Sequence, residues 1–194
     1  MKKRLLITGF DPFGGNSMNP SWVAVEMLPD HIGNFVLCKL PIPTVFGKAA
    51  NIVLEKAKEF HPDVILCIGL AAGRDAVTPE RIAVNIRDAR IADNEGNQPA
   101  GDRIVPDGPA AYFSTVPVEK MAQSIRDAGV PAAVSNTAGT FVCNDTLYTL
   151  LHHYAGTDTR VGFIHVPNTP KSGNPSLPIE QIVAALTVAI TSCS

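Results

Sequence analysis

Short continuous apolar runs are the feature that most constrains how this chain can fold. They occupy residues 5–7, 64–69, 132–135 and 161–166, and the first two end on or close to a glycine. Continuous apolar runs of this length are typical of strands that are buried on both faces, as in a parallel sheet covered by helices on each side. The pattern therefore predicts a central, mainly parallel sheet.

Amphipathic segments lie between these runs and predict helices over residues 44–60, 117–128 and 178–190. We expect Thr44 to cap the first of them, and Gly129 suits the position just past the end of the second. Strands that alternate with helices favour right-handed crossover connections. The predicted fold class is α/β, a three-layer α/β/α sandwich.

The middle of the chain departs from this alternation. Residues 81–86 alternate polar and apolar side chains, as a half-buried strand does, and residues 93–97 have the composition of a turn. We therefore expect an antiparallel excursion there. At 194 residues the chain has the usual size of one domain, so residues 1–194 are expected to form a single domain.

Composition narrows the class of partner. Charged residues make up only 18% of the chain and the formal net charge is −2, which argues against a nucleic-acid partner. The apolar run before Gly9 is too short for a signal peptide, and no window approaches the roughly 18 apolar residues of a membrane span. The four cysteines form no CxxC pair and are expected to be reduced. A cytoplasmic protein without a membrane partner is the expectation.

Cys143 is the first candidate for chemistry, because ligands of open α/β sheets bind beyond the carboxyl ends of the strands. It follows a loop of small residues and precedes a predicted helix over residues 144–151. A thiol at a helix N-terminus is favoured as thiolate, and the free backbone N–H groups there can receive an oxyanion. The alternative is that a free cysteine is a small buried hydrophobe. That alternative suits the other three cysteines, Cys38, Cys67 and Cys193.

His165 and Glu80 are the next candidates. His165 alone among the five histidines ends a predicted core strand, although a satisfied core histidine is the alternative. Glu80 lies just beyond the loop at residues 69–73, where a buried carboxylate could accept the imidazole N–H and fix its tautomer. The alternative for Glu80 is a surface carboxylate paired with Arg74 or Arg81.

The loop at residues 9–15 carries two phenylalanines, Phe10 and Phe13, and matches neither a P-loop nor a GxGxxG fingerprint. They either line an apolar slot or pack beneath the loop. No cluster of histidine, cysteine and carboxylate residues has the spacing of a zinc site, so no metal is expected.

Taken together, these residues resemble the pyroglutamyl peptidase I family. The N-terminal block at residues 7–15 and 19–22 is similar to the family's signature. Further similar blocks follow in the same order and extend the resemblance over nearly the whole chain. They are residues 69–74, 79–85, 88–96, 107–112, 135–144 and 162–167.

The resemblance implies a cysteine exopeptidase that removes N-terminal 5-oxoproline (pyroglutamate) from peptides, with a triad of Cys143, His165 and Glu80. It also implies a cytosolic homotetramer that needs no cofactor or metal. Two departures stand out. Leu70 occupies a position where the family often has glutamine, and residues 168–175 differ from the family's usual loop.

A neutral lactam calls for an apolar pocket with a few polar partners. Its expected walls are Phe10, Phe13, Phe141 and Val142, with the loop that contains Leu70 bonding the lactam. The backbone N–H of Cys143, with Arg90, is expected to form the oxyanion hole. Two alternatives remain: a binding protein without turnover, and a nucleoside phosphorylase whose phosphate is held by Arg74.

Overall fold

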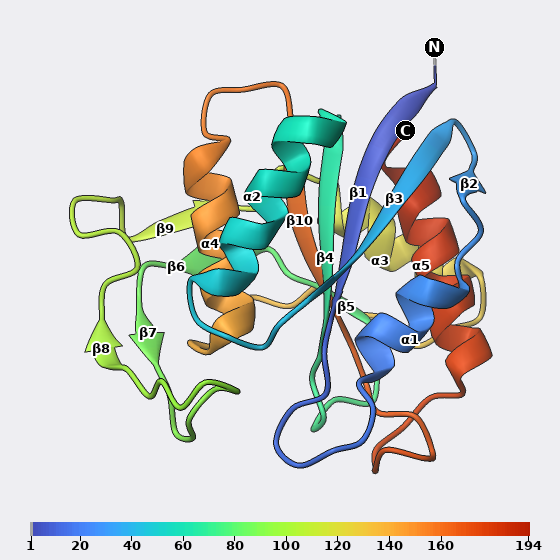
Figure 1. The fold of residues 1–194 in the computed structure, drawn as a ribbon. Coiled ribbons are helices and arrows are strands. Elements are labelled where there is room, and N and C mark those ends of the chain that lie inside the picture. The colour runs from blue at the N-terminus through green and yellow to red at the C-terminus, as the bar shows by residue number, and fades with distance from the viewer. Residues whose placement is uncertain (1) are drawn as a thin grey trace.

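A six-stranded sheet runs through the middle of the computed structural model, which describes residues 2–194 (Figure 1). The four inner strands β3, β1, β4 and β10 are parallel, and the short edge strands β2 and β5 are antiparallel to their neighbours. In spatial order the strands are β2 (His31–Ile32), β3 (Phe35–Ile42), β1 (Lys3–Phe10), β4 (Val64–Leu70), β10 (Arg160–Val166) and β5 (Thr78–Pro79).

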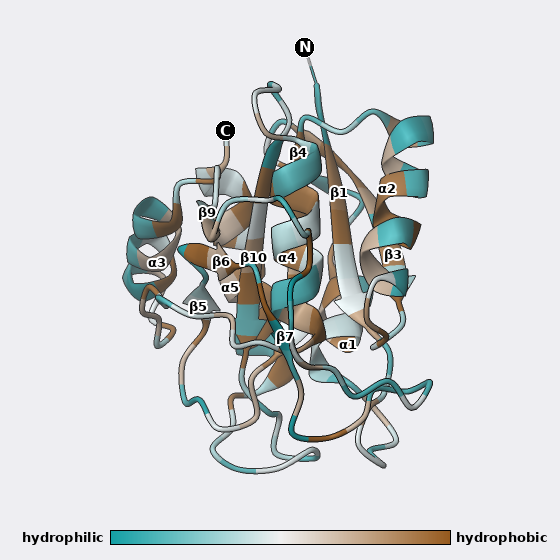
Figure 2. Cartoon of the chain, turned by 90° about the vertical axis from the view of Figure 1, so that its left-hand side faces the viewer, coloured by the Kyte–Doolittle hydropathy of each residue, from teal (hydrophilic) through white to brown (hydrophobic). Residues whose placement is uncertain are grey.

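Helices cover both faces of this sheet. Helices α2 (Lys48–Phe60) and α4 (Val142–His153) lie on one face. The other face carries α1 (Pro20–Met27), α3 (Val118–Asp127) and α5 (Ile179–Ser192). Successive side chains of β1 point alternately into the hydrophobic cores on the two faces of the sheet. Figure 2 shows hydrophilic and hydrophobic bands alternating around α2. The predicted three-layer α/β/α arrangement is confirmed.

The predicted antiparallel excursion is also present. Strand β6 (Ile82–Val84) pairs with β9 (Ala111–Phe113), and β7 (Arg87–Asp88) pairs with β8 (Ala100–Asp102). The predicted turn is held by Asp93, whose Oδ1 accepts the backbone N–H groups of Glu95 and Asn97, both at 2.9 Å. This arm lies beside α4, at the left of Figure 1.

Two predicted elements differ in the structure. Residues 132–135 form no strand; they make only isolated bridges, Val77 with Ala132 and Glu80 with Ser135. Helix α2 begins at Lys48 rather than Thr44. The Thr44 backbone N–H and hydroxyl both donate to Asp11 Oδ1, at 2.7 and 2.8 Å, which holds Thr44 against the loop after β1, and Gly47 takes the N-cap position without a side-chain bond.

Helix α1 was not predicted, because residues 22–25 are apolar throughout and show no helical period. Its start nonetheless carries a local signal. The Asn19 side chain accepts the Ser21 N–H at 3.1 Å, and Pro20 occupies the first helical position.

The carboxyl ends of β1, β4 and β10 meet at one edge of the sheet, at the bottom of Figure 1. The segments that follow these strands lie at this edge, where α/β proteins bind their ligands. Within residues 2–194, no helix is both long and apolar enough to cross a membrane.

Candidate active site

Glu80 and His165 form a buried pair at this edge. His165 is the penultimate residue of β10 and lies opposite Thr78 of the edge strand, so Glu80 follows only two residues beyond that contact. The imidazole Nδ1 is 2.7 Å from Glu80 Oε1. Glu80 is 0% exposed and His165 is 4% exposed. Glu80 is therefore not a surface carboxylate.

The charge state of Glu80 decides which imidazole nitrogen is free. Burial raises the pKa of Glu80, but the hydrogen bond and charge of His165, with a further bond from Arg74, outweigh it and hold the pKa below its ordinary value. An ionised carboxylate only accepts hydrogen bonds, so Nδ1 of His165 carries the proton. Nε2 is left as the basic nitrogen.

Cys143 lies on the same face of the sheet as His165. It is the second residue of α4, and a Cβ placed on Gly69 would be 3.0 Å from Cys143 Sγ. Gly69 pairs with His165 across β4 and β10, and paired residues of parallel strands face the same side. The Phe163 ring lies beside both positions, with its centroid 4.8 Å from that of His165.

Opposing influences act on the Cys143 thiol. Burial, and next the negative charge of Glu80, raise its pKa to about 12, although Arg74 and the Cys143 backbone N–H act in the opposite direction. Desolvation thus opposes the helix N-terminus, which by itself favours the thiolate. A thiol with a raised pKa reacts readily only beside a base, and His165 lies on the same face of the sheet.

Helix α4 is anchored by two buried polar residues that directly follow Cys143. The Asn144 side chain accepts the Val84 N–H and donates to the carbonyls of Val84 and Ile86. Asp145 accepts the Gly47 N–H at 2.7 Å and Arg87 Nε at 2.6 Å. Both side chains are fully buried. Neither residue was predicted from the sequence, although two adjacent polar residues directly after Cys143 were a visible signal.

The start of α4 also presents free donors. Within residues 2–194 no side chain caps this end of the helix. The first N–H groups of a helix have no intrahelical partner, so those of Val142, Cys143 and Asn144 lie outside the helical ladder. Such groups are well suited to bind an oxyanion next to Sγ.

A cavity of about 520 Å³ adjoins the residues that lead into α4. The ring centroids of Phe13 and Phe141 are 5.1 Å apart, and Phe46 packs edge-on against Phe141 at 5.2 Å. The cavity is lined by Phe13, Asp88, Arg90, Ile91, Gly139, Thr140 and Phe141. Asp88, Ile91 and the neighbouring Phe46 were not foreseen from the sequence.

The other expected pocket residues lie elsewhere. Phe10 is 2% exposed and packs against Phe163, with centroids 6.2 Å apart, and Val142 is fully buried in the same core. Leu70 ends β4 and is half-buried. The structure thus brings Phe13, Phe141 and Arg90 around one cavity and places Phe10 and Val142 in the core beneath it.

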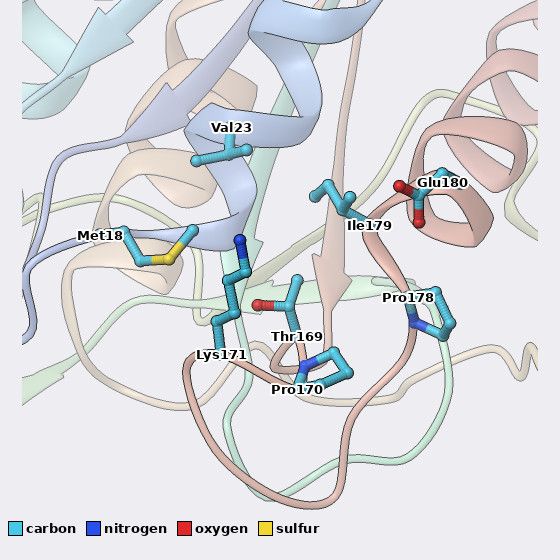
Figure 3. A pocket seen from close by; sticks show the side chains of 8 residues that line it. All are labelled: Met18, Val23, Thr169, Pro170, Lys171, Pro178, Ile179 and Glu180. Carbon is cyan, nitrogen blue, oxygen red and sulfur yellow. The ribbon is translucent and has the colours of Figure 1, made fainter.

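A second cavity, of about 310 Å³, lies under the segment that follows β10. Figure 3 shows Lys171 reaching up between Met18 and Thr169, with Pro178 and Ile179 on the opposite side. This is where residues 168–175 depart from the family pattern. Within residues 2–194, no group of three or more histidine, cysteine or carboxylate side chains is placed to hold a metal ion.

The Arg74 guanidinium already donates hydrogen bonds to other residues of the protein. Its Nη1 donates to Glu80 Oε1 at 2.6 Å and to Thr78 Oγ1 at 2.5 Å, and its Nη2 donates to the Thr137 carbonyl at 2.9 Å. A phosphate would have to displace these bonds. The phosphorylase alternative therefore loses the residue on which it depended.

A parallel α/β sheet with a cysteine at a helix start, beside a histidine paired to a buried carboxylate, defines a hydrolase of the thiol-dependent class. Comparison with known proteins agrees, since residues 3–194 match the family model for pyroglutamyl peptidase. The pyrrolidone-carboxylate peptidases of Staphylococcus carnosus and Clostridium perfringens are each 50% identical, covering 98% and 96% of this chain and 93% and 91% of theirs.

Solved structures show the same relationship. The crystal structure of pyroglutamyl peptidase I from Bacillus amyloliquefaciens superposes with a TM-score of 0.96 at 44% identity, covering 100% of this chain and 95% of that one. The chain belongs to the pyroglutamyl peptidase family and is a hydrolase of the cysteine peptidase class.

Proposed function

We propose that this protein removes the N-terminal pyroglutamyl residue from peptides, using Cys143, His165 and Glu80 as a catalytic triad. The observation that carries the proposal is the enclosed His165–Glu80 pair, at 2.7 Å, beside the Gly69 position over which the thiol lies. Family membership supports the substrate class, since the matching relatives are named pyrrolidone-carboxylate peptidases.

In the proposed reaction, Cys143 Sγ attacks the pyroglutamyl carbonyl carbon while His165 Nε2 takes the thiol proton. The resulting oxyanion accepts hydrogen bonds from the Cys143 N–H and from Arg90. The C–N bond then breaks, and His165 gives its proton to the departing amine, which leaves a thioester. His165 next activates a water molecule that hydrolyses the thioester and releases pyroglutamate and the free thiol.

We assign the lactam ring to the cavity that Phe13 and Phe141 line together. A ring without a free amine suits apolar walls, and backbone groups of the loop that begins at Leu70 would bond its amide. Phe10 and Val142 belong to the core cluster on which Phe141 packs, so they shape this pocket from beneath.

We further propose, from the family resemblance alone, a single catalytic domain over residues 1–194 that acts as a cytoplasmic homotetramer without a metal or cofactor. Light scattering after gel filtration tests the assembly, and a monomeric mass would contradict it. Full activity after dialysis against a chelator is the expected result for the metal.

The decisive experiment is hydrolysis of a chromogenic pyroglutamyl amide. We expect wild-type turnover that a thiol alkylator abolishes, no turnover by Cys143→Ala, and near wild-type turnover by Cys38→Ala, whose thiol lies on β3. Activity that survives in Cys143→Ala would end the assignment of the nucleophile. Binding of the amide without any turnover by the wild type would instead favour the binding-protein alternative.

A further inference from the structure

Arg74 contacts the same carboxylate oxygen as the histidine does. Glu80 Oε1 accepts Nδ1–H of His165 at 2.7 Å and Nη1–H of Arg74 at 2.6 Å. The second oxygen, Oε2, is buried and has no hydrogen-bond partner among residues 2–194. Both charge-bearing partners of this carboxylate thus meet at one oxygen, which the guanidinium and the imidazole share.

We propose that Arg74 is a positioning residue for the reaction: it balances the charge of the Glu80 carboxylate that holds His165, and it holds the loop that leads into Cys143. The inference rests on the proposed function, because it takes His165 as the base. Arg74 itself is not proposed to touch the substrate.

The Glu80 carboxylate is shared between two positive groups. Hydrogen bonds from His165 and Arg74 hold the pKa of Glu80 below its ordinary value despite burial, so the carboxylate that faces His165 is ionised. The Arg74 guanidinium, 2.6 Å from Glu80 Oε1, balances part of this buried negative charge. The titratable and charged groups around His165 are Glu80 beyond the edge strand, Arg74 from the loop after β4, and Cys143 from α4.

Arg74 also connects two segments of the site. While Nη1 holds Glu80, Nη2 of the same guanidinium donates to the Thr137 carbonyl at 2.9 Å. Thr137 lies in the loop that carries Phe141 and enters α4. A planar guanidinium can serve two acceptors in fixed directions, whereas a lysine ammonium on this stem acts as a point charge. Arg74 therefore links the Glu80–His165 pair to the wall of the proposed substrate cavity.

Two substitutions separate these roles. Arg74→Gln removes the charge, and Arg74→Lys keeps the charge but not the two-point contact. Arg81→Gln is the matched control, because Arg81 is the next residue after Glu80 and instead bonds Glu119 and the Asn136 side chain at the surface.

The measurement is the pH profile of kcat/KM with a chromogenic pyroglutamyl amide. We expect the acid limb of Arg74→Gln to move to higher pH, since the protonated imidazole would then have to balance the buried Glu80 carboxylate without the guanidinium. Arg74→Lys should keep the acid limb and raise KM several-fold, because the loop contact is lost. Arg81→Gln should stay within about twofold of wild type on both counts.

A second readout does not need turnover. The NMR signals of the His165 ring, followed over pH in Cys143→Ala, should change at a higher pH when Arg74→Gln is added. Identical His165 titrations, together with an unchanged KM in Arg74→Lys, would overturn the proposal.

The two hypotheses fail separately. A wild type that cleaves no pyroglutamyl amide would refute the proposed function, and the NMR titration would still decide the role of Arg74. If Arg74→Gln does not fold, an Arg74→Lys enzyme with wild-type KM overturns the proposal by itself, because the loop contact would then be dispensable.

Discussion

A methyl group added at Gly69 is the sharpest perturbation of this site. Its carbon would lie 2.7 and 2.8 Å from two ring atoms of Phe163 and 3.0 Å from Cys143 Sγ. Carbon contacts are most favourable at about 3.5–4.0 Å, so one of these neighbours has to move. The Gly69 backbone lies outside the left-handed region, and alanine can adopt it. The effect of Gly69→Ala therefore comes from the contacts alone.

The magnitude follows from overpacking a dense core. Inserting a methyl group where nothing can yield freely costs about 1–3 kcal/mol of unfolding free energy. For a chain of this length that corresponds to a Tm lower by roughly 2–12 °C. Displacement of Phe163 disturbs the neighbouring His165 ring, and displacement of Sγ moves the nucleophile itself. We expect kcat/KM to fall on the order of 10–100-fold as a result.

Thermal unfolding and pyroglutamyl amide hydrolysis together provide the assay, with two glycine controls. A Cβ on Gly73 would meet no atom within 4 Å in the described chain, so Gly73→Ala should match the Tm of wild type. A Cβ on Gly162 would run into the Val116 side chain, in the core on the opposite face of the sheet from His165. Gly162→Ala should therefore lower Tm yet keep the kcat/KM of the folded enzyme.

The reasoning is refuted if Gly69→Ala loses stability but keeps wild-type kcat/KM, because Cys143 and Phe163 would then not be the groups displaced. It is equally refuted if Gly69→Ala and Gly73→Ala are indistinguishable in both measurements, since the close contacts would then not exist in the folded protein.

Three further predictions test the site. Glu80→Gln should cut turnover strongly and slow alkylation of Cys143 near neutral pH, because an amide orients His165 but cannot balance its positive charge; superimposable alkylation curves and unchanged turnover would leave a dyad of Cys143 and His165. A proline amide, which lacks the ring carbonyl, should react far more slowly than the pyroglutamyl amide, because polar groups aimed at the lactam stay unpaired, and equal rates would mean that the pocket is misassigned. The pKa of Glu80 is lowered in the folded state, so its contribution to stability is complete above its ordinary value of about 4.3 and is lost as the pH falls through the lower folded value. Urea unfolding should accordingly show the gap in stability between wild type and Glu80→Gln narrowing below about pH 4, and a constant gap would contradict the assignment.

The sequence by itself determined the elements whose signals are local. Strands β1, β4 and β10 follow from continuous apolar runs, and α3 and α5 follow from their helical period. Cys143 and His165 could be chosen as candidate site residues for the same reason. The carboxyl ends of parallel strands meet at one edge of the sheet, so a residue at the end of an apolar run or at the start of the following helix is expected at that edge.

Local sequence patterns did not predict the elements whose boundaries depend on contacts between distant segments. Thr44 has the chemistry of a cap, yet it is bonded to Asp11, 33 residues earlier, and α2 starts at Lys48 after Gly47. Residues 132–135 have the apolar content of a strand but meet their neighbours only through isolated bridges.

The chemistry of the site depended most on tertiary structure. The helix start at Cys143 indicated a thiolate, but burial raises its pKa to about 12. Glu80 looked equally suited to a surface ion pair until packing placed it against a histidine 85 residues away, with Arg74 on the same oxygen. Periodicity and caps are encoded within a few neighbouring residues, whereas desolvation and charge pairing depend on which distant groups the folded chain brings together and on how completely it excludes water from them.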